Sequence, residues 1–560
     1  MDIQPADLAL ARLAELERSR GDKICMTQPM GNGALREYTW AEAIGESRRM
    51  ATWLRAQGYP EGSNIAIISK NCAHWLLCDW AIWMAGHISV PLYPTLTAES
   101  VRKILEHSEA KAAFIGKLDD WDAMKPGVPA DVQCIAFPLS PPNDFPQWDA
   151  IVAEQAPLEH LPERKAEDLA TIIYTSGTTG MPKGVMHSFG AFAWAIKSGN
   201  KRFSMGPNDR VLSYLPLSHI AERIAVEAGA LQTGMHIFFA DSLDTFLQDL
   251  QRARPTFFFS VPRLWVKFKQ GVNAKMPDEK LKRLLRIPIL SGLIKKKILS
   301  GLGLDQVKFA GGGAAPMPRS VLDWYKRLGL EIIEVYGMTE NMAISHSNLP
   351  GDTHPGYVGY PYEGVECRIA EDGEVQMRSP AVMVGYFKEP EKTKEALTED
   401  GWLRTGDLGE VDGQGRLRIT GRVKDIFKTS KGKYVAPAPI EDKLVAHDAV
   451  EACCVAGADR EQPFGILMLS AEALESCKDS AHREALMQDL GRYRESVNQQ
   501  LDQHEQLSFL VVIEDQWTTE TGFVTPTMKV KRDVVEKAYV RHADAWAAER
   551  KPVVWAGQIQ

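Results

Sequence analysis

The stretch Thr171-Ile-Ile-Tyr-Thr-Ser-Gly-Thr-Thr-Gly-Met-Pro-Lys183-Gly184 decides the fold. Its apolar start predicts a short buried strand, which runs directly into a loop rich in glycine and hydroxyl side chains. Glycines let backbone N–H groups approach an anion closely, the hydroxyls add hydrogen-bond donors, and Lys183 supplies a compact positive charge. A loop of this composition after a strand is suited to bind a triphosphate.

This loop differs from the P-loop of nucleotide hydrolases. The P-loop pattern ends in Gly-Lys followed by Ser or Thr, whereas Gly184 follows Lys183 here and the glycine spacing differs. The simpler alternative is a polar surface loop. A Gly/Thr/Ser run of this length, placed directly after a strand and followed by a lysine, is hard to explain as a linker.

Short apolar segments recur outward from this loop and alternate with helical patterns. They lie at residues 65–68, 112–115, 211–214, 236–239, 256–259 and 331–335. Such alternation predicts an α/β fold with layered, mostly parallel sheets and helices. Near residue 410 the pattern changes to short strands separated by glycines, with a turn at 430–433. We therefore predict a large N-terminal domain over residues 1–421 and a small α+β C-terminal domain over residues 422–560.

Composition excludes several classes of protein. A chain of 560 residues exceeds a single core and predicts at least two domains. The net charge of −8 argues against a nucleic-acid partner, because such proteins are usually basic. The eight cysteines show no metal-like spacing, which is typical of buried thiols in a reducing compartment.

Targeting signals are not apparent. The N-terminal residues mix charges and lack an apolar core before a cleavage site, so we expect no signal peptide. No apolar run approaches the ~18 residues of a membrane span, and the predicted location is the cytoplasm. Residues 280–297 carry seven Lys and Arg with interleaved Leu and Ile, which is typical of a solvated helical face or of contact with anionic lipid. Peripheral membrane contact and a homodimer are both left open.

The segment YTSGTTGMPKGV resembles the signature of the adenylate-forming superfamily, which contains acyl-CoA synthetases, luciferases and adenylation domains. Further motifs follow in the order of that family. They are GGGAAP at 311–316, YGMTE at 336–340, GWLRTGDL at 401–408, GRVKD at 421–425 and TPTMKVKR at 525–532. The resemblance covers most of the chain and is strongest to AMP-forming long-chain fatty acyl-CoA synthetases.

The resemblance implies a role for each motif. Tyr336 would stack on adenine, Thr339 would hold the α-phosphate, and Glu340 would bind Mg²⁺. Asp407 and Arg422 would bind the ribose hydroxyls. The remaining nucleotide-binding residues implied by the motifs are Thr175, Ser176, Gly177, Thr178, Thr179, Gly180, Lys183, Gly313, Ala314, Ala315, Pro316, Gly337 and Met338.

The C-terminal motif is implied to carry the catalytic lysine. Lys529 would bridge the substrate carboxylate and the α-phosphate. Many family members have glycine before this lysine, whereas this chain has Met528, so Lys531 is an alternative to Lys529. By the same resemblance the C-terminal domain is mobile, with a hinge near residue 424, and its hairpin presents Lys428 to coenzyme A.

The implied activity is ATP-dependent activation of an acid to an acyl-adenylate, then thioester formation, with ATP, Mg²⁺ and coenzyme A as cofactors. Residues 213–223 resemble the acyl-pocket segment, which would place His219 near the substrate carboxylate; the alternative is a satisfied core histidine. Segments 256–265 and 432–441 favour long- or medium-chain fatty acids. The alternatives are an aryl-acid CoA ligase, an acyl-AMP ligase that loads a carrier protein, and a non-catalytic nucleotide-binding protein.

Overall fold

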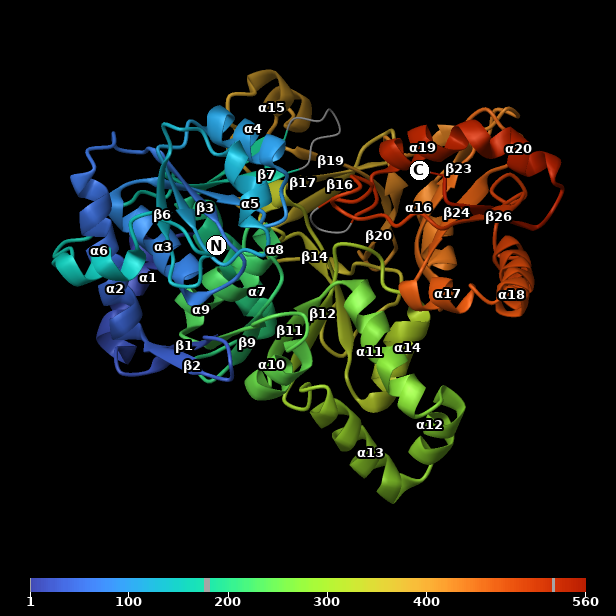
Figure 1. Ribbon diagram of the computed structural model, residues 1–560, viewed down its shortest axis with the longest axis horizontal. Helices are drawn as coiled ribbons and strands as arrows, with labels where there is room; N and C mark the ends of the chain where they lie inside the picture. The colour runs from blue at the N-terminus through green and yellow to red at the C-terminus, as the bar shows by residue number, and fades with distance from the viewer. Residues whose placement is uncertain (1, 176–181, 526–528, 560) are drawn as a thin grey trace. The chain divides into compact units, whose positions relative to one another are not determined.

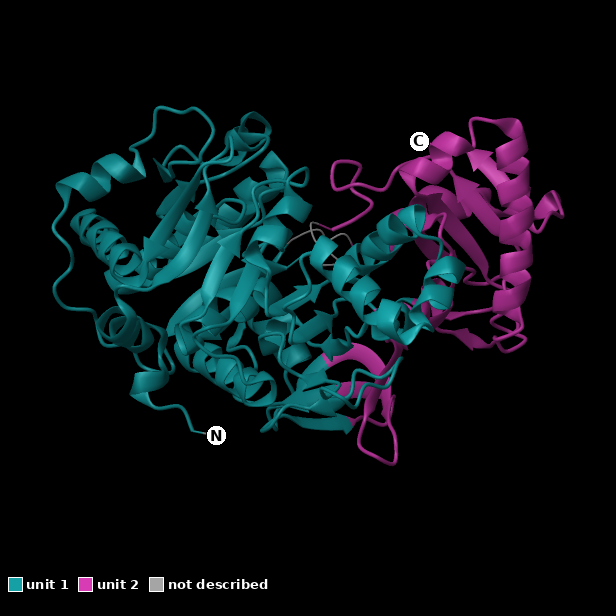
Figure 2. Cartoon of the chain, turned by 90° about the horizontal axis from the view of Figure 1, so that it is seen from below, with its two compact units in different colours: residues 1–315, 321–368, 376–404 teal, residues 316–320, 369–375, 405–560 magenta. Residues whose placement is uncertain are grey.

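The computed structural model describes residues 2–175, 182–525 and 529–559 (Figure 1). The chain divides into two compact units (Figure 2). Unit 1 comprises Met1–Ala315, Val321–Arg368 and Gln376–Arg404, and unit 2 comprises Pro316–Ser320, Ile369–Val375 and Thr405–Gln560. The predicted α/β class, with a large N-terminal part and a smaller C-terminal part, is confirmed.

A seven-stranded sheet forms the centre of unit 1, in the order β18-β8-β7-β4-β3-β5-β6. Strands β3 to β7 pair in parallel, whereas β7, β8 and β18 pair antiparallel. The loop after Thr175 thus connects two neighbouring antiparallel strands, and Thr175 pairs with Lys183. The strands are β3 (Asn64–Ile68), β4 (Ile88–Leu92), β5 (Ala112–Ile115), β6 (Gln133–Ala136), β7 (Leu169–Thr175), β8 (Lys183–Ser188) and β18 (Gly385–Tyr386).

Alternate residues of these strands face two separate hydrophobic cores. In β3, Ile65 and Ile67 belong to the core that includes α2 (Trp40–Ala56) and α3 (Ala73–Ala85). Ala66 and Ile68 face the other core, with α4 (Ala98–Ser108). Both faces are covered, so the strands read as continuous apolar runs. The same covering explains α3, in which every residue is buried.

Two further sheets belong to unit 1, in the orders β2-β1-β10-β9 and β11-β12-β13-β14-β15. Their strands are β1 (Ile24–Pro29), β2 (Leu35–Thr39), β9 (Arg210–Ser213), β10 (His236–Phe239), β11 (Phe257–Ser260), β12 (Phe309–Gly312), β13 (Ile332–Tyr336), β14 (His346–Ser347) and β15 (Tyr360–Pro361). The helices, of which α14 crosses the division between the units, include α1 (Ala9–Arg20), α5 (Trp121–Met124), α6 (Trp148–Glu154), α7 (Phe189–Phe203), α8 (Ile220–Glu222), α9 (Gly229–Thr233), α10 (Phe246–Ala253), α11 (Pro262–Lys275), α12 (Asp278–Leu285), α13 (Pro288–Gly301), α14 (Arg319–Leu328) and α15 (Pro390–Ala396).

Unit 2 has its own core around the sheet β23-β24-β25-β26. In β23, Cys454 packs with α19 and α20, whereas Cys453 packs with α16 and α18. The helix predicted over 532–549 is interrupted by a 3-10 turn at Val540–His542. The strands are β23 (Val450–Ala456), β24 (Phe464–Leu469), β25 (Leu510–Ile513) and β26 (Val553–Gly557), and the helices are α16 (Pro437–Leu444), α17 (Ala471–Ser476), α18 (Ser480–Asn498), α19 (Arg532–Tyr539) and α20 (Ala543–Ala548).

The division between the units falls inside three strands, β16 (Glu366–Ile369), β17 (Glu374–Arg378) and β19 (Leu403–Val411). In unit 2, β19 pairs antiparallel with β20 (Leu417–Arg422). A second hairpin follows, made of β21 (Phe427–Lys428) and β22 (Tyr434–Val435). The sequence indicated this hairpin through its Ser-Lys-Gly-Lys turn.

A buried ionic cluster fixes helix α3 against the central sheet. The guanidinium of Arg223 pairs with the carboxylates of Asp79 and Glu227, the latter at 3.0 Å, and donates to Thr171 Oγ1 at 2.7 Å. All three charged side chains are fully buried. Removing one charge from such a group leaves the others unpaired in a medium of low dielectric constant.

We therefore expect Arg223→Leu to lower the free energy of unfolding by about 3–5 kcal/mol, because two buried carboxylates lose their counter-charge. Urea denaturation of the two proteins measures this difference. The matched control is Arg254→Leu, which removes an exposed pair with Asp305 and should cost below about 1 kcal/mol. Equal losses for the two variants would contradict the prediction.

Candidate active site

The turn at 339–341 is held against strand β8 through backbone contacts. The His187 ring of β8 donates from Nε2 to the carbonyl of Thr339 at 2.7 Å. Burial lowers the pKa of His187 to about 4, so the ring is neutral at physiological pH. From the other side, the backbone N–H of Met383 donates to the carbonyl of Glu340 at 2.8 Å. Thr339 and Glu340 therefore have fixed positions.

Tyr386 joins the predicted anionic and cationic residues of unit 1. Its hydroxyl donates to Glu340 Oε1 at 2.9 Å. The Nζ atom of Lys183 lies 4.7 Å from the centre of the Tyr386 ring, within cation–π distance. Burial, followed by the neighbouring Glu340 carboxylate, raises the pKa of Tyr386, so the phenol remains a proton donor. One side chain thus contacts two residues that are 157 positions apart in sequence.

The sequence analysis did not single out Tyr386. It lies in a two-residue strand, within a segment that matches none of the motifs. Its place beside Lys183 comes from the pairing of Tyr386 with Val185, a contact between distant segments. The strand pairing of β18 with β8 was the signal needed to find it, and a single sequence does not reveal that pairing.

Two glycines of the predicted nucleotide-binding motifs are required sterically. A Cβ atom on Gly313 would lie 2.8 Å from a methyl group of Val335, and one on Gly337 would lie 2.4 Å from the backbone of Ala343. Ala314 has a φ of 66°, in the left-handed region that non-glycine residues rarely adopt. Strained backbone of this kind is often found at functional sites. Tyr336 ends strand β13, directly before Gly337, and Met338 precedes the turn at 339–341.

The segment predicted to line an acyl pocket contains a buried carboxyl group. Glu222 Oε1 accepts hydrogen bonds from the Ser213 hydroxyl at 3.0 Å and the Tyr214 N–H at 2.9 Å. Burial raises its pKa from the usual 4.5 to about 8. His219 lies at the start of α8, where its Nδ1 accepts the N–H of Ala221 at 3.2 Å. His219 thus caps α8 and is only partly exposed.

Unit 2 brings together the two residues predicted to bind ribose. Asp407 and Arg422 are directly opposite on the β19–β20 hairpin, and Arg422 Nε donates to Asp407 Oδ1 at 2.8 Å. The Asp407 side chain is 9% exposed, whereas that of Arg422 is 56% exposed. The Thr405 hydroxyl accepts the N–H of Asp407 at 3.1 Å.

The predicted C-terminal residues lie on short, exposed segments of unit 2. Lys428 is in β21, with its Nζ 5.6 Å from the ring centre of Tyr434. Lys529 is exposed, and its carbonyl and N–H bond the N–H and hydroxyl of Thr525 at 2.8 and 3.1 Å. Lys531 is partly buried at the start of α19, where its N–H donates to Phe523 at 2.8 Å. Pro316 also belongs to unit 2.

Several predicted residues lie outside the described part of the chain. They are Ser176, Gly177, Thr178, Thr179, Gly180 and the departure at Met528. Thr175 and Lys183 border the first of these segments and are described as a pair of opposed strand residues.

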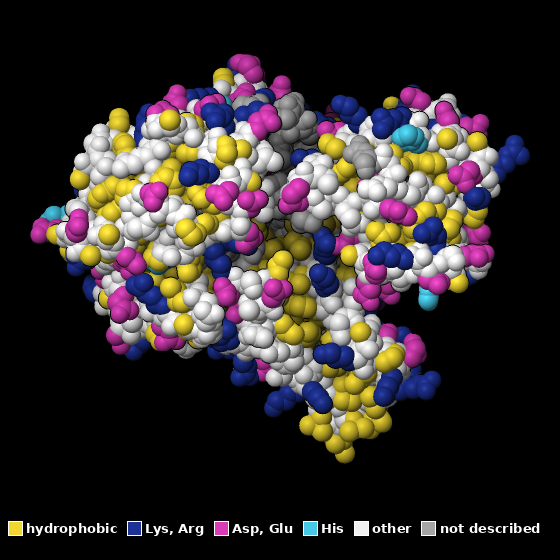
Figure 3. Space-filling model, viewed as in Figure 1, with side chains coloured by type: hydrophobic (Ala, Val, Ile, Leu, Met, Phe, Trp, Pro, Cys, Tyr) yellow, Lys and Arg dark blue, Asp and Glu magenta, His cyan; other side chains and the backbone are white. Residues whose placement is uncertain are grey.

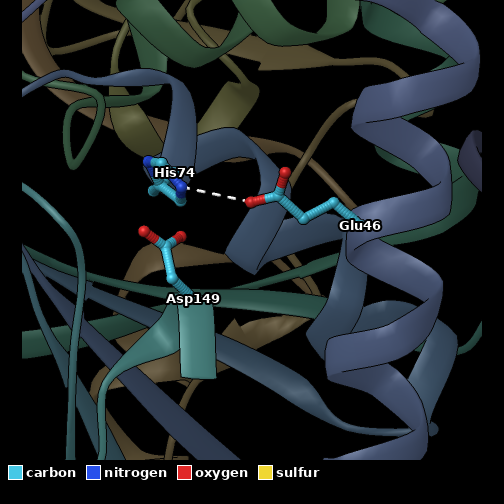
Figure 4. A group of neighbouring side chains, drawn as sticks. All are labelled: Glu46, His74 and Asp149. Atoms are coloured by element: carbon cyan, nitrogen blue, oxygen red, sulfur yellow. Dashed lines mark hydrogen bonds and ion pairs between the residues drawn. The ribbon is translucent and has the colours of Figure 1, made fainter. Parts of the chain in front are cut away.

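A second polar group in unit 1 has the spacing of a metal site (Figure 4). Potential ligand atoms of Glu46, His74 and Asp149 lie within 4.8 Å of one another. However, Glu46 Oε1 already accepts from His74 Nε2 at 3.2 Å and from Trp148 Nε1 at 2.7 Å, and Arg36 approaches Oε2 at 3.3 Å. The Arg36 charge would repel a cation. The group is better explained as a polar network that joins α2, α3 and α6.

Comparison with solved structures places this fold in one class. The anthranilate CoA ligase AuaEII in complex with anthranoyl-AMP superposes with a TM-score of 0.79, covering 97% of this chain and 100% of that one at 20% identity. The O-succinylbenzoate CoA synthetase of Bacillus subtilis in complex with AMP gives a TM-score of 0.72 over 93% and 97% at 23% identity. At these identities the likeness concerns the fold alone.

Sequence comparison is more specific. A model of AMP-binding enzymes matches residues 13–387, and a model of the AMP-binding enzyme C-terminal domain matches residues 424–550. The chain therefore belongs to the family of AMP-binding enzymes. A long-chain-fatty-acid–CoA ligase of Mycobacterium bovis is 31% identical over 96% of this chain and 97% of its own. The peroxisomal long chain acyl-CoA synthetase 7 of Arabidopsis thaliana is 29% identical over 93% and 83%. The resemblance stated from the motifs is confirmed.

The raised pKa of Glu222 predicts a pH dependence of stability. In the folded chain this carboxyl keeps its proton up to about pH 8, whereas the unfolded carboxyl ionises near pH 4.5. The folded chain thus binds more protons between these values, and stability falls as the pH rises through this window. Glu222→Gln cannot ionise, so the variant should lack this part of the fall.

Urea denaturation at pH 5, 7 and 8.5 measures the effect. Glu159→Gln, at an exposed position of the same unit, is the control and should follow the wild-type pH profile. If the Glu222→Gln and wild-type profiles run parallel, the buried carboxyl does not hold its proton.

Proposed function

We propose that this protein is an AMP-forming acyl-CoA synthetase that activates a long-chain fatty acid. The observation that carries the proposal is the near-full-length likeness, at 31% identity, to a long-chain-fatty-acid–CoA ligase. ATP, Mg²⁺ and coenzyme A are the cofactors of the proposed reaction. The acid first forms an acyl-adenylate with release of pyrophosphate, and the thiol of coenzyme A then displaces AMP to give the thioester. Medium-chain fatty acids are included in the proposal.

The first step joins two anions, so the site must neutralise charge. A carboxylate attacks the α-phosphorus of ATP, and developing negative charge on phosphate oxygens is stabilised by fixed cations and backbone donors. In unit 1 we assign this role to Lys183, to the loop after Thr175 and to the hydroxyl of Thr339. His219 would contact the carboxylate end of the fatty acid.

Glu340 fits a magnesium ligand by its chemistry. A carboxylate has about four lone-pair positions, and the bond from Tyr386 uses one of them, which leaves acceptor capacity for a hard cation. When bound, Mg²⁺ would neutralise the phosphates. Tyr386 would orient the Glu340 carboxylate and the Lys183 ammonium relative to each other, and so acts as a positioning residue.

Unit 2 would supply the ribose contacts and the second cation. Asp407 can accept from both ribose hydroxyls, and Arg422 already fixes one of its oxygens. We assign Lys529 to the acyl-adenylate step and Lys428 to coenzyme A. We also propose that residues 422–560 rotate between the two half-reactions, about a hinge near Lys424, since such gating is common where one site serves two chemistries.

The alternatives differ in the acid or in the acyl acceptor. An aryl-acid CoA ligase is favoured by the similar fold of the anthranilate enzyme, although 20% identity supports only the fold. Loading of a carrier protein, and nucleotide binding without catalysis, are the others. A panel of acids from C2 to C18 with benzoate, assayed with and without coenzyme A, separates these. Among the described residues no helix is long and apolar enough to cross a membrane. A homodimer, peripheral membrane contact and a cytoplasmic location stay predictions.

Lys529→Ala should reduce fatty-acid-dependent pyrophosphate release by at least about 100-fold, because one oriented cation is worth roughly 3–4 kcal/mol in the transition state. Lys531→Ala should change the rate by less than about threefold. Lys478→Ala, on the surface of the same unit, is the control. A larger loss for Lys531→Ala than for Lys529→Ala would move the catalytic role to Lys531.

Tyr386→Phe keeps the ring beside Lys183 but removes the hydroxyl that donates to Glu340. A hydrogen bond to a charged group is worth about 1.5–3 kcal/mol, so kcat should fall about 10- to 100-fold. The magnesium concentration that gives half the maximal rate should also shift, which a purely structural role would not cause. Tyr360→Phe is the matched control, since its hydroxyl donates to Asp352 at 3.3 Å. An unchanged magnesium dependence in Tyr386→Phe would exclude the positioning role.

A further inference from the structure

Helices α12 and α13 form a hairpin in unit 1 whose end is apolar and exposed (Figure 1). Its apolar tip consists of Ile287, Ile289, Leu290 and Leu293, with exposed fractions of 46, 83, 40 and 64%. Helix α13, which is described throughout, contains no buried residue. Single exposed apolar side chains are normal, but four within seven positions form a patch that calls for a partner.

The hairpin is anchored at its base and not at its tip. Arg327 of α14 pairs with Asp278 at 2.9 Å, and Leu281 is buried. At the other end, Gln251 of α10 donates to the carbonyl of Gly301 at 2.6 Å. These contacts hold the two ends of the hairpin against the rest of unit 1 and leave the residues between them in water.

Basic side chains surround the apolar tip. Arg283, Arg286, Lys296 and Lys297 are exposed, and the sequence has no acidic residue between positions 280 and 304. Figure 3 shows hydrophobic side chains gathered at this end of the hairpin with Lys and Arg around them. An apolar centre with a cationic rim matches the two layers of an anionic bilayer surface, namely the acyl boundary and the phosphate head groups.

We propose that the apolar tip docks this enzyme on anionic lipid bilayers. The apolar side chains enter the head-group boundary, and the surrounding cations contact lipid phosphates. A second copy of the chain is a poorer partner, because two tips would bring like charges together. The net charge of −8 opposes general adsorption to an anionic surface, so binding depends on this local segment. The inference rests on the proposed function, because long-chain fatty acids partition into bilayers.

Sedimentation with vesicles tests the docking without any substrate. The full chain is mixed with phosphatidylcholine vesicles, or with vesicles that contain one quarter phosphatidylglycerol. We expect at least tenfold stronger binding to the anionic vesicles, with loss of binding at high salt. Ile289→Glu combined with Leu293→Glu should weaken binding at least tenfold. Lys296→Glu combined with Lys297→Glu should weaken it at least tenfold, since each cation near an anionic surface contributes about fivefold.

Leu243→Glu is the matched control, since Leu243 is 93% exposed and lies outside the hairpin. It should change vesicle binding by less than twofold. Equal binding of wild type and both tip variants overturns the proposal, as does equal binding to neutral and anionic vesicles. Self-association that the tip variants abolish, without vesicle binding, would assign the tip to a dimer interface instead and also overturns it.

The enzymatic proposal is tested separately, by thioester formation from octanoate, which is soluble without vesicles. Tip variants that lose vesicle binding but keep this activity support docking as a distinct property. If wild type binds anionic vesicles but forms no thioester from any fatty acid, the proposed function fails while the docking surface stands.

Discussion

The candidate site depends on the pairing of β8 with two strands at once. Its partner β7 places Lys183 opposite Thr175, and its partner β18 places Tyr386 beside Val185. This register brings the Tyr386 ring under the Lys183 ammonium and its hydroxyl to Glu340. A cation and a buried carboxylate are thereby held near each other by one rigid side chain. Chemistry between two anions needs such charges fixed in advance, because reorganising them during the reaction would raise the barrier.

The sequence reveals local features well, because they depend on nearby residues. The run from Thr171 shows the strand that enters the glycine-rich loop, and the pairing of Asp407 with Arg422 follows from motifs only 15 residues apart. Features that depend on distant segments are not visible in one sequence. The partnership of Tyr386 with Glu340 and the three-way charge cluster of Arg223 arise from sheet order and helix packing. The turn that divides the last helix at Val540–His542 is similarly a packing effect.

Buried polar groups explain why the site region holds one shape. The neutral His187, the protonated Glu222 and the paired Arg223 each have a defined hydrogen-bond partner in the core of unit 1. Such groups are costly unless satisfied, so they favour a single arrangement of the elements that carry them. By contrast, the Lys529 segment and the apolar tip are exposed, as expected for parts that meet substrates or a surface.

The central claim is that this AMP-binding enzyme activates a long-chain fatty acid as its adenylate. The most direct measurement is exchange of labelled pyrophosphate into ATP with Mg²⁺ and palmitate, in the absence of coenzyme A. The account predicts exchange that requires the fatty acid and exceeds by at least tenfold the exchange with benzoate or acetate. Exchange that is absent with every fatty acid, in protein that still binds AMP, would contradict it.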